Sequence, residues 1–437
     1  MFVRNMVLAW TIGIVASGLT LALILVLVQL CVFKAGSRIL SGLGDGTAFG
    51  KKLRSAGLIA FGVLNVPLGL FILESLIKPR SVLFYAPPIR LEGLIRPISY
   101  VFFVWTIGSV LFVAACPVLM GIFALIQFSE KRRAKREFVE SIQVVDLSRR
   151  RFVRLFLAGI AAVPFAASAY GAVAAKRART VETVDVPIDA LPGAFDGLKI
   201  VQLSDIHAGL FMSSNQIRNW VGIANGLNPD IIVLTGDFVA SRTSEVSIFM
   251  KGVSGLRARY GVYGCLGNHD MFTDSEATIE REFQKAGFVL LRNRNQYIDV
   301  AGTRLNLIGV DFIENHARHG KRLNDILARL KVDSPNILLC HNPNLFEDAA
   351  RSGIDLMLSG HTHGGQIALK LGETLIAPAR LATMFIAGLF KIGQSHLYVN
   401  RGLGTTGPPI RINAPPEVTV IRLRAGGASA QSLGKTV

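Results

Sequence analysis

Cysteine is scarce in this chain of 437 residues, which has only four. Cys31 and Cys116 lie in long apolar runs, and Cys265 and Cys340 each stand alone before a short polar loop. No pair has the Cys-x-x-Cys spacing of a zinc ribbon or a thioredoxin-like redox site, and the four give no disulfide framework. The sequence therefore excludes a disulfide-stabilised scaffold and a zinc fold held by cysteines.

Acidic residues are also few in the first 180 positions, which hold 7 Asp and Glu against 22 Lys and Arg. Residues 181–437 hold 23 against 25, so the net charge of +17 belongs almost entirely to the first part. This positive charge lies beside apolar runs, which argues for a basic region embedded in a membrane. We therefore expect a membrane as a partner and no nucleic acid.

Charged residues are absent or nearly absent from four long stretches of the first part. These stretches lie near 7–33, 57–77, 98–128 and 155–175. Each reaches the roughly 20 residues that a helix needs to cross a bilayer. The sequence therefore predicts an all-α transmembrane region over 1–178 with about four helices.

Basic residues in the connecting segments predict the orientation of these helices. With the N-terminus outside, the inner loops 34–56 and 129–154 hold 14 Lys and Arg, and the outer segments hold 8. Arg149, Arg150 and Arg151 precede the fourth apolar run and resemble a twin-arginine export signal, although a basic anchor before a membrane helix explains them equally well. Both interpretations place residues 181–437 outside the cytoplasm, and cleavage after Ala174 stays an open alternative.

Short apolar runs alternate with amphipathic stretches in the C-terminal part. After a linker and first strand at 179–192, Leu198–Leu203, Ile231–Thr235 and Val262–Leu266 have the pattern of buried strands, and Gln216–Leu227 has a helical pattern. Such alternation is typical of a layered α/β fold. We place this domain at 193–425 and expect a flexible tail at 426–437.

Polar residues with metal-binding chemistry follow the predicted strands. They are Ser204-Asp205-Ile206-His207, Gly236-Asp237, Gly267-Asn268-His269-Asp270, His341-Asn342-Pro343 and Gly360-His361-Thr362-His363. Ligand sites form at the carboxyl ends of strands in α/β sheets. In Asp205-x-His207 and His361-x-His363, we expect alternate residues to leave a strand end on the same side and to reach one centre. Asp and His together suit Mn, Fe or Zn better than Mg or Ca, and two such ions can clamp a phosphoryl group.

In this order, the DxH, GD, GNHD, His and GHxH blocks resemble the calcineurin-like metallophosphoesterase superfamily over about residues 198–423. The stretches SGHTHGGQ and RGLGTTGPPIRINAPPEVTVI are similar to a bacterial branch of small phosphoesterases, which often carry a membrane anchor or a twin-arginine signal. The resemblance implies a four-layer α/β sandwich and two divalent metal ions, of Mn, Fe or Zn. It places one metal at Asp205, His207 and His363, the other at Asn268, His341 and His361, and Asp237 between them.

The resemblance also implies a mechanism. A metal-bridging hydroxide would attack phosphorus in line, His269 would protonate or stabilise the leaving oxygen, and Asp270 would orient His269. The sequence departs from the protein phosphatases of the superfamily, because Ala240-Ser241-Arg242 stands where they carry Asp-Arg-Gly. This favours a small phosphodiester or a phospholipid. Arg401 and Arg411 are candidates to bind its phosphate or headgroup.

We therefore expect a phosphodiesterase rather than a monoesterase, acting on a lipid or envelope phosphoester. We expect it in a bacterial inner membrane, with several crossings and the catalytic domain on the extracytoplasmic side. A nuclease or cyclic-nucleotide phosphodiesterase of the same superfamily is one alternative, and an inactive membrane sensor or scaffold is another. The near-neutral charge of the domain argues against the first, and its full set of metal ligands argues against the second. The segment LATMFIAGLF around Met384 and Phe385 is either core or a membrane-dipping edge.

Overall fold

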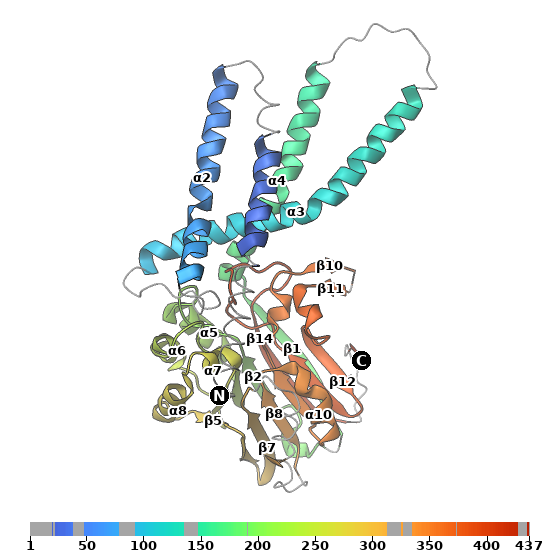
Figure 1. Cartoon of the computed structure of the whole chain (residues 1–437). Coiled ribbons are helices and arrows are strands. Elements are labelled where there is room, and N and C mark those ends of the chain that lie inside the picture. The colour runs from blue at the N-terminus through green and yellow to red at the C-terminus, as the bar shows by residue number, and fades with distance from the viewer. Residues whose placement is uncertain are drawn as a thin grey trace, which may run out of the picture. The chain divides into compact units, whose positions relative to one another are not determined.

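The chain forms two compact units, Met1–Ala172 and Val173–Val437, which are described separately. The computed structural model describes residues 20, 22–37, 48–77, 92–134, 147–189, 191–312, 325–326, 334–372, 374–426 and 435–436 (Figure 1). The division lies within helix α4 (Leu147–Arg177), close to the boundary at 178 that the sequence predicts.

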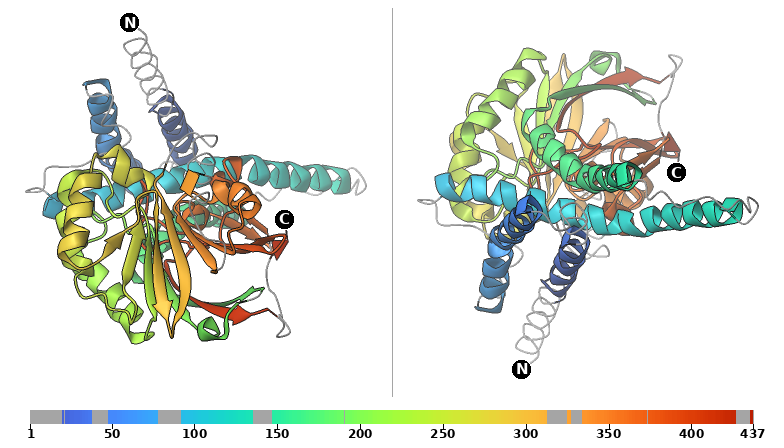
Figure 2. Two further views of the ribbon diagram at one scale, coloured as in Figure 1. Left: turned by 90° about the horizontal axis from the view of Figure 1, so that it is seen from below. Right: turned by 90° about the horizontal axis from the view of Figure 1, so that it is seen from above.

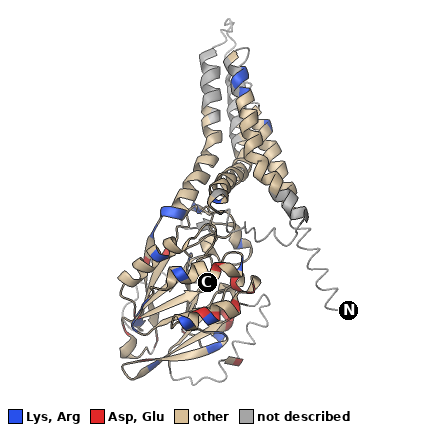
Figure 3. Cartoon of the chain, turned by 90° about the vertical axis from the view of Figure 1, so that its left-hand side faces the viewer, with Lys and Arg blue, Asp and Glu red and all other residues tan. Residues whose placement is uncertain are grey.

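Long helices make up the described part of the N-terminal unit. They are a helix at Ala22–Ser37, α2 (Ala48–Ile77), α3 (Glu92–Ala134) and the first part of α4. In Figure 3 the coloured part of these helices is mostly tan, which marks residues other than Lys, Arg, Asp and Glu. Two stretches among the described residues are long and apolar enough to cross a membrane, Ile95–Val118 in α3 and Gly159–Arg177 in α4. The apolar helices at Ala22–Ser37 and Arg54–Leu70 are shorter, and the predicted span near 7–33 lies partly outside the described residues, so four crossings stay a prediction.

The helices of this unit pack around Trp105 of α3. Its ring stacks on Phe165 of α4 with a centroid distance of 5.1 Å and meets Phe61 of α2 edge-on at 6.0 Å. Its indole nitrogen donates a hydrogen bond to Gln29 Oε1 over 3.1 Å. A Cβ at Gly108 would overlap the ring of Phe165, so this glycine allows α3 and α4 to approach closely.

Two mixed sheets form the centre of the C-terminal unit. The first contains, in spatial order, β1 (Thr180–Ile188), β14 (Glu417–Ala425), β2 (Lys199–Leu203), β3 (Ile231–Thr235), β4 (Val262–Cys265) and β5 (Val289–Leu290). The second contains β15 (Lys435–Thr436), β12 (Gly388–Ile392), β13 (Ser395–Val399), β9 (Leu356–Ser359), β8 (Asn336–Cys340), β7 (Thr303–Val310) and β6 (Arg294–Val300). Every residue of β3 and β8 is buried, as expected for parallel strands that are covered on both faces.

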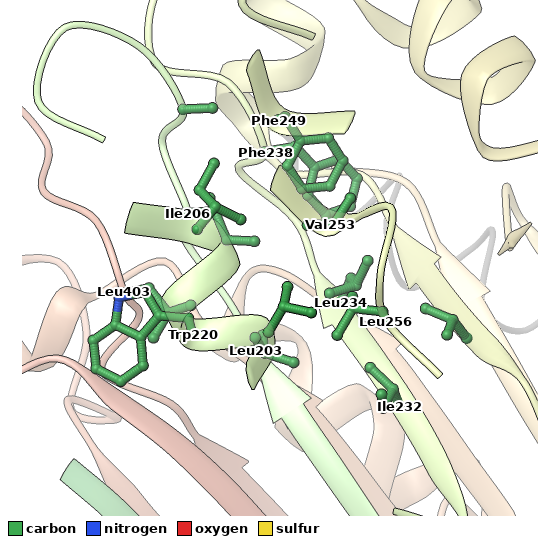
Figure 4. Close-up of a cluster of buried hydrophobic side chains, with 14 of the residues drawn as sticks. Leu203, Ile206, Trp220, Ile232, Leu234, Phe238, Phe249, Val253, Leu256 and Leu403 are labelled. Atoms are coloured by element: carbon green, nitrogen blue, oxygen red, sulfur yellow. The ribbon is translucent and has the colours of Figure 1, made fainter. Parts of the chain in front are cut away.

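Apolar contacts stack these elements as helix, sheet, sheet and helix (Figure 2). The facing sides of the two sheets share one cluster, to which the first sheet contributes Val233 and the second Leu339. On its other side the first sheet packs against α5 (Ser214–Gly226), α6 (Val246–Val253) and α8 (Glu276–Lys285). Figure 4 shows part of this cluster, in which Phe238 stacks on Phe249 with a centroid distance of 4.8 Å. Helix α10 (Phe346–Arg351) buries Phe346 against the second sheet.

The segment 179–192, predicted as a linker and first strand, belongs mostly to the sheet. Strand β1 pairs in parallel with β14 along its whole length, from Thr180 opposite Glu417 to Ile188 opposite Ala425. The first strand predicted within 179–192 thus corresponds to β1, whose backbone completes the edge of the first sheet. Within the predicted tail 426–437, Lys435–Thr436 pairs with β12, and residues 427–434 and 437 lie outside the described residues.

Candidate metal centre

The polar loops that the sequence singles out follow the carboxyl ends of parallel strands from both sheets. Asp205 and His207 follow β2, Asp237 follows β3, Asn268 and His269 open α7 (Asn268–Phe272) after β4, His341 follows β8, and His361 and His363 follow β9. Strands β2, β3 and β4 are parallel to one another, and so are β8 and β9. The loops of the two packed sheets therefore meet at one edge.

Asp205, His207 and His363 form the first ligand group. Their ligand atoms all lie within 4.8 Å of one another, and all three residues are buried. The Nε2 atoms of His207 and His363 face each other at 3.1 Å, and Asp205 Oδ1 lies 3.4 Å from His363 Nε2. This group has the size and chemistry to hold one metal ion.

Asp237, His341 and His361 form the second ligand group, whose ligand atoms also lie within 4.8 Å of one another. Asp237 Oδ2 is 3.2 Å from His341 Nε2, and His361 Nδ1 is 3.2 Å from the same His341 atom. The same Oδ2 atom of Asp237 is also 3.4 Å from His207 Nε2. The carboxylate of Asp237 therefore lies between the two ligand groups.

The side chains present fit a metal ion. Asn268 Oδ1 is buried and accepts no hydrogen bond from any residue that the structure describes. Leaving a buried polar atom unpaired costs about 1–3 kcal/mol, a cost that a cation would remove. Imidazole nitrogens, carboxylate oxygens and one amide oxygen are the ligands that divalent transition metals take in proteins.

Three imidazoles of the centre are held in the neutral form that binds metals. Burial, followed by repulsion from His269, lowers the pKa of His207 to about 3. Burial, followed by His341, lowers the pKa of His361 to about 4. Burial and His207 also lower the pKa of His363 well below its usual range. Metal affinity is highest when such ligands carry no competing proton.

His341 differs because two carboxylates face it. Burial opposes its charged form, but Asp237 and Asp205 outweigh burial and raise the pKa of His341 to about 10. In return, His341 and His269 lower the pKa of Asp237 well below its usual range, although burial opposes this shift. His341 Nδ1 donates to the carbonyl of Thr235 over 2.7 Å, which aims Nε2 at Asp237. A metal at Nε2 would replace the proton there.

The ligand residues lie in tight turns rather than on extended strand ends. Strand β2 ends at Leu203 and β9 at Ser359, before the ligands begin. The φ angles are positive at five of these residues: Asp205 (48°), His207 (47°), Asp237 (54°), His361 (72°) and His363 (53°). The predicted geometry, with alternate residues of an extended strand on one side, is therefore wrong. Residues held in such sparsely populated conformations store about 1–3 kcal/mol each and cluster at functional sites.

Gly236 makes the approach of three loops possible. Its φ is 83°, and a Cβ there would lie 2.6 Å from the backbone nitrogen of Gly267 and 2.8 Å from His341 Nδ1. Both separations are too short for a carbon atom, so only glycine fits without moving the loops that carry Asp237, Asn268 and His341.

His269 lies half-buried beside the first ligand group. Its ring meets that of His207 edge-on at 4.6 Å. Its Nδ1 is 2.6 Å from the carbonyl oxygen of Ala240, and Nδ1 donates in this pair because a carbonyl oxygen only accepts. Its backbone N–H donates to Asp237 Oδ1 over 2.8 Å. These two contacts fix the imidazole, which also lies with His207 and Asp237 in a third group whose ligand atoms are all within 4.8 Å of one another.

Asp270 is fully buried, and its carboxylate binds the main chain. It accepts hydrogen bonds from the N–H groups of Phe238 (2.8 Å), Val239 (3.2 Å) and Gly267 (2.9 Å). These bonds join the loop after β3 to the loop after β4. The sequence predicts that Asp270 orients His269, whereas in the structure the carbonyl of Ala240 makes that contact with the ring.

The two arginines predicted to bind substrate are engaged within the protein. Arg411 is 1% exposed, donates to the carbonyls of Gly404 and Ala414, and lies 3.3 Å from His363 Nδ1. Arg401 pairs with Glu182 at 2.8 Å and with Glu417 at 2.5 Å. Contact between Arg411 and a substrate would require Arg411 to leave this network.

Sequence reasoning missed Thr406. Its hydroxyl lies 3.1 Å from His207 Nε2 and 3.0 Å from His363 Nε2, so it points at the first ligand group. The stretch GLGTTGPP, which contains Thr406, has the composition of an ordinary turn. No motif of characteristic spacing distinguishes this threonine. The same holds for Phe312, whose ring lies 5.9 Å from that of His361.

Comparison with known proteins gives a consistent result. The family model for calcineurin-like phosphoesterases matches residues 198–365, which contain all five polar loops. The chain is 31% identical over 291 residues to the metallophosphoesterase YkuE of Bacillus subtilis, covering 64% of this chain and 98% of that protein. It is 31% identical over 229 residues to the phosphodiesterase YaeI of Escherichia coli, covering 52% and 82%.

A third relative is the bovine transmembrane protein with metallophosphoesterase domain. The two are 34% identical over 272 residues, which cover 59% of this chain and 60% of the bovine protein. The match thus spans less than two thirds of the bovine protein but nearly all of YkuE. The chain therefore belongs to the calcineurin-like phosphoesterase family.

Proposed function

We propose that the chain is a membrane-anchored phosphodiesterase that uses two divalent metal ions, of Mn, Fe or Zn, on a lipid or envelope phosphoester. The observation that carries this proposal is the position of Asp237, whose Oδ2 atom lies 3.4 Å from His207 and 3.2 Å from His341. A carboxylate oxygen this close to histidines of both ligand groups could serve two metal ions, and paired ions clamp phosphoryl groups in hydrolases.

In this proposal the first ligand group would hold one ion and the second group with Asn268 would hold the other, with the carboxylate of Asp237 close to both. When bound, two such ions neutralise charge on a phosphoryl group and make hydroxide available at neutral pH. The protein contributes the fixed geometry. Thr235 aims His341 from behind, and Asp270 joins the loops that carry Asp237 and Asn268.

His269 is the residue we assign to proton transfer. Its Nδ1 is occupied by the carbonyl of Ala240, so Nε2 is the atom that can pass a proton to the leaving oxygen. Thr406 would face the same space and can donate its hydroxyl proton to a phosphoryl oxygen. We give Asp270 and Arg411 positioning roles and keep Arg401 as the candidate for a phosphate contact, because its side chain is 20% exposed.

Two observations favour a small diester. Ala240-Ser241-Arg242 follows Asp237 where phosphoprotein phosphatases of the family carry Asp-Arg-Gly. The relative YaeI is described as a phosphodiesterase. A lipid or envelope substrate is favoured by the two stretches that can cross a membrane and by the bovine transmembrane relative.

The distribution of basic residues supports the proposed location. We infer four crossings in a bacterial inner membrane, with the catalytic domain on the extracytoplasmic side, because the inner loops would then hold 14 Lys and Arg against 8 outside. Arg149–Arg151, at the start of α4, fits either a twin-arginine signal or the basic anchor of that helix.

The test uses the purified full chain in detergent with Mn²⁺. Hydrolysis of bis(4-nitrophenyl) phosphate is compared with that of 4-nitrophenyl phosphate for the native chain, Asp237→Asn and Asp299→Asn. Asp299 is the matched control, because it is an exposed carboxylate at the β6–β7 turn, away from the carboxyl end of β7. We expect the diester to react faster, Asp237→Asn to lose about 10²-fold or more, and Asp299→Asn to lose nothing.

Each other result has a definite meaning. Faster turnover of the monoester would make the enzyme a phosphatase. Native activity in Asp237→Asn would refute the role of the shared carboxylate. Two bound metals per chain without turnover of either ester would favour a sensor or scaffold.

A further inference from the structure

Exposed apolar side chains of the C-terminal unit gather in one short segment. Among the described residues of 180–425, the large apolar side chains that are substantially exposed are Val181, Phe272, Leu369, Ile376, Leu381 and Met384. Four of these six lie within residues 369–384, and Leu381 is 95% exposed. Single exposed apolar residues are ordinary, but a group of them marks an interaction surface. We call residues 368–384 the apolar segment.

The described part of the apolar segment, which leaves out residue 373, contains a short hairpin above a buried base. Strands β10 (Leu369–Leu371) and β11 (Thr374–Ile376) pair antiparallel, with Leu369 directly opposite Ile376 (Figure 1). Directly opposite residues point to the same face, so these two exposed side chains lie together. At the base, Ala368 and Ala377 are buried, and the N–H of Ala368 donates to the carbonyl of Ile412 over 3.0 Å.

The base of the apolar segment rests on the histidine loop of the metal centre. A Cβ at Gly365 would overlap the Cβ of Ala377, so the segment and the loop are in direct contact. Just beyond the segment, the carbonyl of Ile386 accepts a hydrogen bond of 2.5 Å from Thr362 Oγ1. Thr362 lies between the ligands His361 and His363. The apolar segment is therefore part of the rim of the metal centre.

The chain enters the C-terminal unit at the same loop. The stretch that can cross a membrane ends at Arg177, and β1 begins at Thr180. Two residues further on, Glu182 pairs with Arg401, whose Cγ would lie 2.8 Å from a Cβ at Gly364. Gly364 therefore lies against Arg401, which links it to the start of β1 through Glu182, and Gly365 lies against the apolar segment.

We propose that the apolar segment docks into the phospholipid bilayer that α4 enters. Leu369, Ile376, Leu381 and Met384 insert at the boundary between headgroups and acyl chains, and the exposed cations of the segment, Lys370 and Arg380, meet anionic headgroups. A tether of two residues between Arg177 and Thr180 keeps this edge within reach of the membrane surface. The docked segment holds the metal centre at headgroup level. This inference rests on the membrane anchoring of the proposed function but not on its catalytic activity.

The experiment places a fluorescent probe at the tip of the apolar segment in the full chain. Cys31 and Cys116 are replaced by serine, and a single cysteine is introduced as Leu381→Cys or, as a control, Lys285→Cys, an exposed residue at the end of α8. The native Cys265 and Cys340 are buried and do not compete for the label. Each variant carries an environment-sensitive nitrobenzoxadiazole group in vesicles of phosphatidylcholine and phosphatidylglycerol, with and without spin-labelled lipid.

We expect blue-shifted emission at position 381 that spin-labelled lipid quenches by about half, since such segments insert about 5–10 Å into the interface. At position 285 we expect the emission of a probe in water and no quenching by lipid. Water-like emission at both positions would overturn the proposal. Blue-shifted emission at 381 without quenching would also overturn it, because a protein would then cover the segment.

The probe reports position and not turnover. Quenching at 381 in an enzyme that hydrolyses no phosphoester would keep the docking inference and refute the proposed function. Turnover without quenching at 381 would refute the docking inference and keep the proposed function.

Discussion

The close approach of loops at Gly236 allows a sharp test of how the metal centre is positioned. The perturbation is Gly236→Ala, compared with Gly353→Ala. The two glycines have nearly the same backbone conformation, with φ of 83° and 78°. They differ in surroundings, because a Cβ at Gly353 meets nothing within 4 Å, whereas one at Gly236 meets Gly267 and His341.

The magnitudes follow from this difference. An alanine held at positive φ costs about 1–2 kcal/mol, and both variants bear this cost. Only Gly236→Ala also overpacks its site, which adds about 1–3 kcal/mol. Its Cβ would lie 2.6 Å and 2.8 Å from its two neighbours, so the loops must separate by several tenths of an ångström or more to reach an ordinary contact of about 3.5 Å. A misplacement near 1 Å costs about 10²-fold in rate.

The assay measures melting temperature, bound metal and kcat on the purified full chain. For a unit of this size, we expect Gly353→Ala to melt lower by about 2–4 °C for each kcal/mol and to keep its metal and kcat. We expect Gly236→Ala to melt lower still, to bind less metal and to lose about 10²-fold in kcat. Equal losses of metal and activity in the two variants, or full activity in Gly236→Ala, would refute the reasoning.

Three further predictions concern single groups. Chelation with EDTA should lower the melting temperature, and Mn²⁺ should restore it, because a metal at 100 times its Kd stabilises the folded protein by about 2.7 kcal/mol. An unchanged melting curve would contradict a resident metal at Asn268. Thr406→Val should lower kcat about tenfold with metal content unchanged, since it removes one hydrogen bond to the substrate, whereas the neighbouring Thr405→Val should leave kcat alone. Burial raises the pKa of the Cys340 thiol to about 12 and that of Cys265 well above its usual range, so both thiols stay protonated at pH 8. Both should therefore resist alkylation by iodoacetamide until the protein unfolds, which mass spectrometry of the two cysteine-containing peptides can check.

The sequence predicted the metal ligands better than their supporting contacts. Candidate ligands such as Asp205 and His361 stand in short blocks of characteristic spacing at the ends of apolar runs, and the structure brings them into groups that could hold a metal ion. Thr406 reaches the centre from a distant loop, and Arg411 is buried through contacts with backbone carbonyls. Neither contact has a local signature, because each depends on how loops far apart in the sequence come together.

For the fold as well, single strands could be predicted from the sequence, whereas their order in the sheet could not. The run IIVLT predicted β3 because its four apolar residues, Ile231–Leu234, form an unbroken block before Thr235. The order of strands was not predictable in this way, because β14 inserts between β1 and β2 from the far end of the domain. The turns at the ligands were also missed, since positive φ at Asp237 or His363 is imposed by packing and not by residue type.

The position of β14 between β1 and β2 has a consequence for how the protein is made. Strand β1 leaves the ribosome long before its partner in the sheet, Glu417–Ala425. Until then, the edges of β1 and β2 have unpaired backbone groups that are open to aggregation. Pairing across so long a stretch of chain is also slow. The first sheet therefore cannot be completed until β14 has been translated, whatever the state of the N-terminal helices at that time.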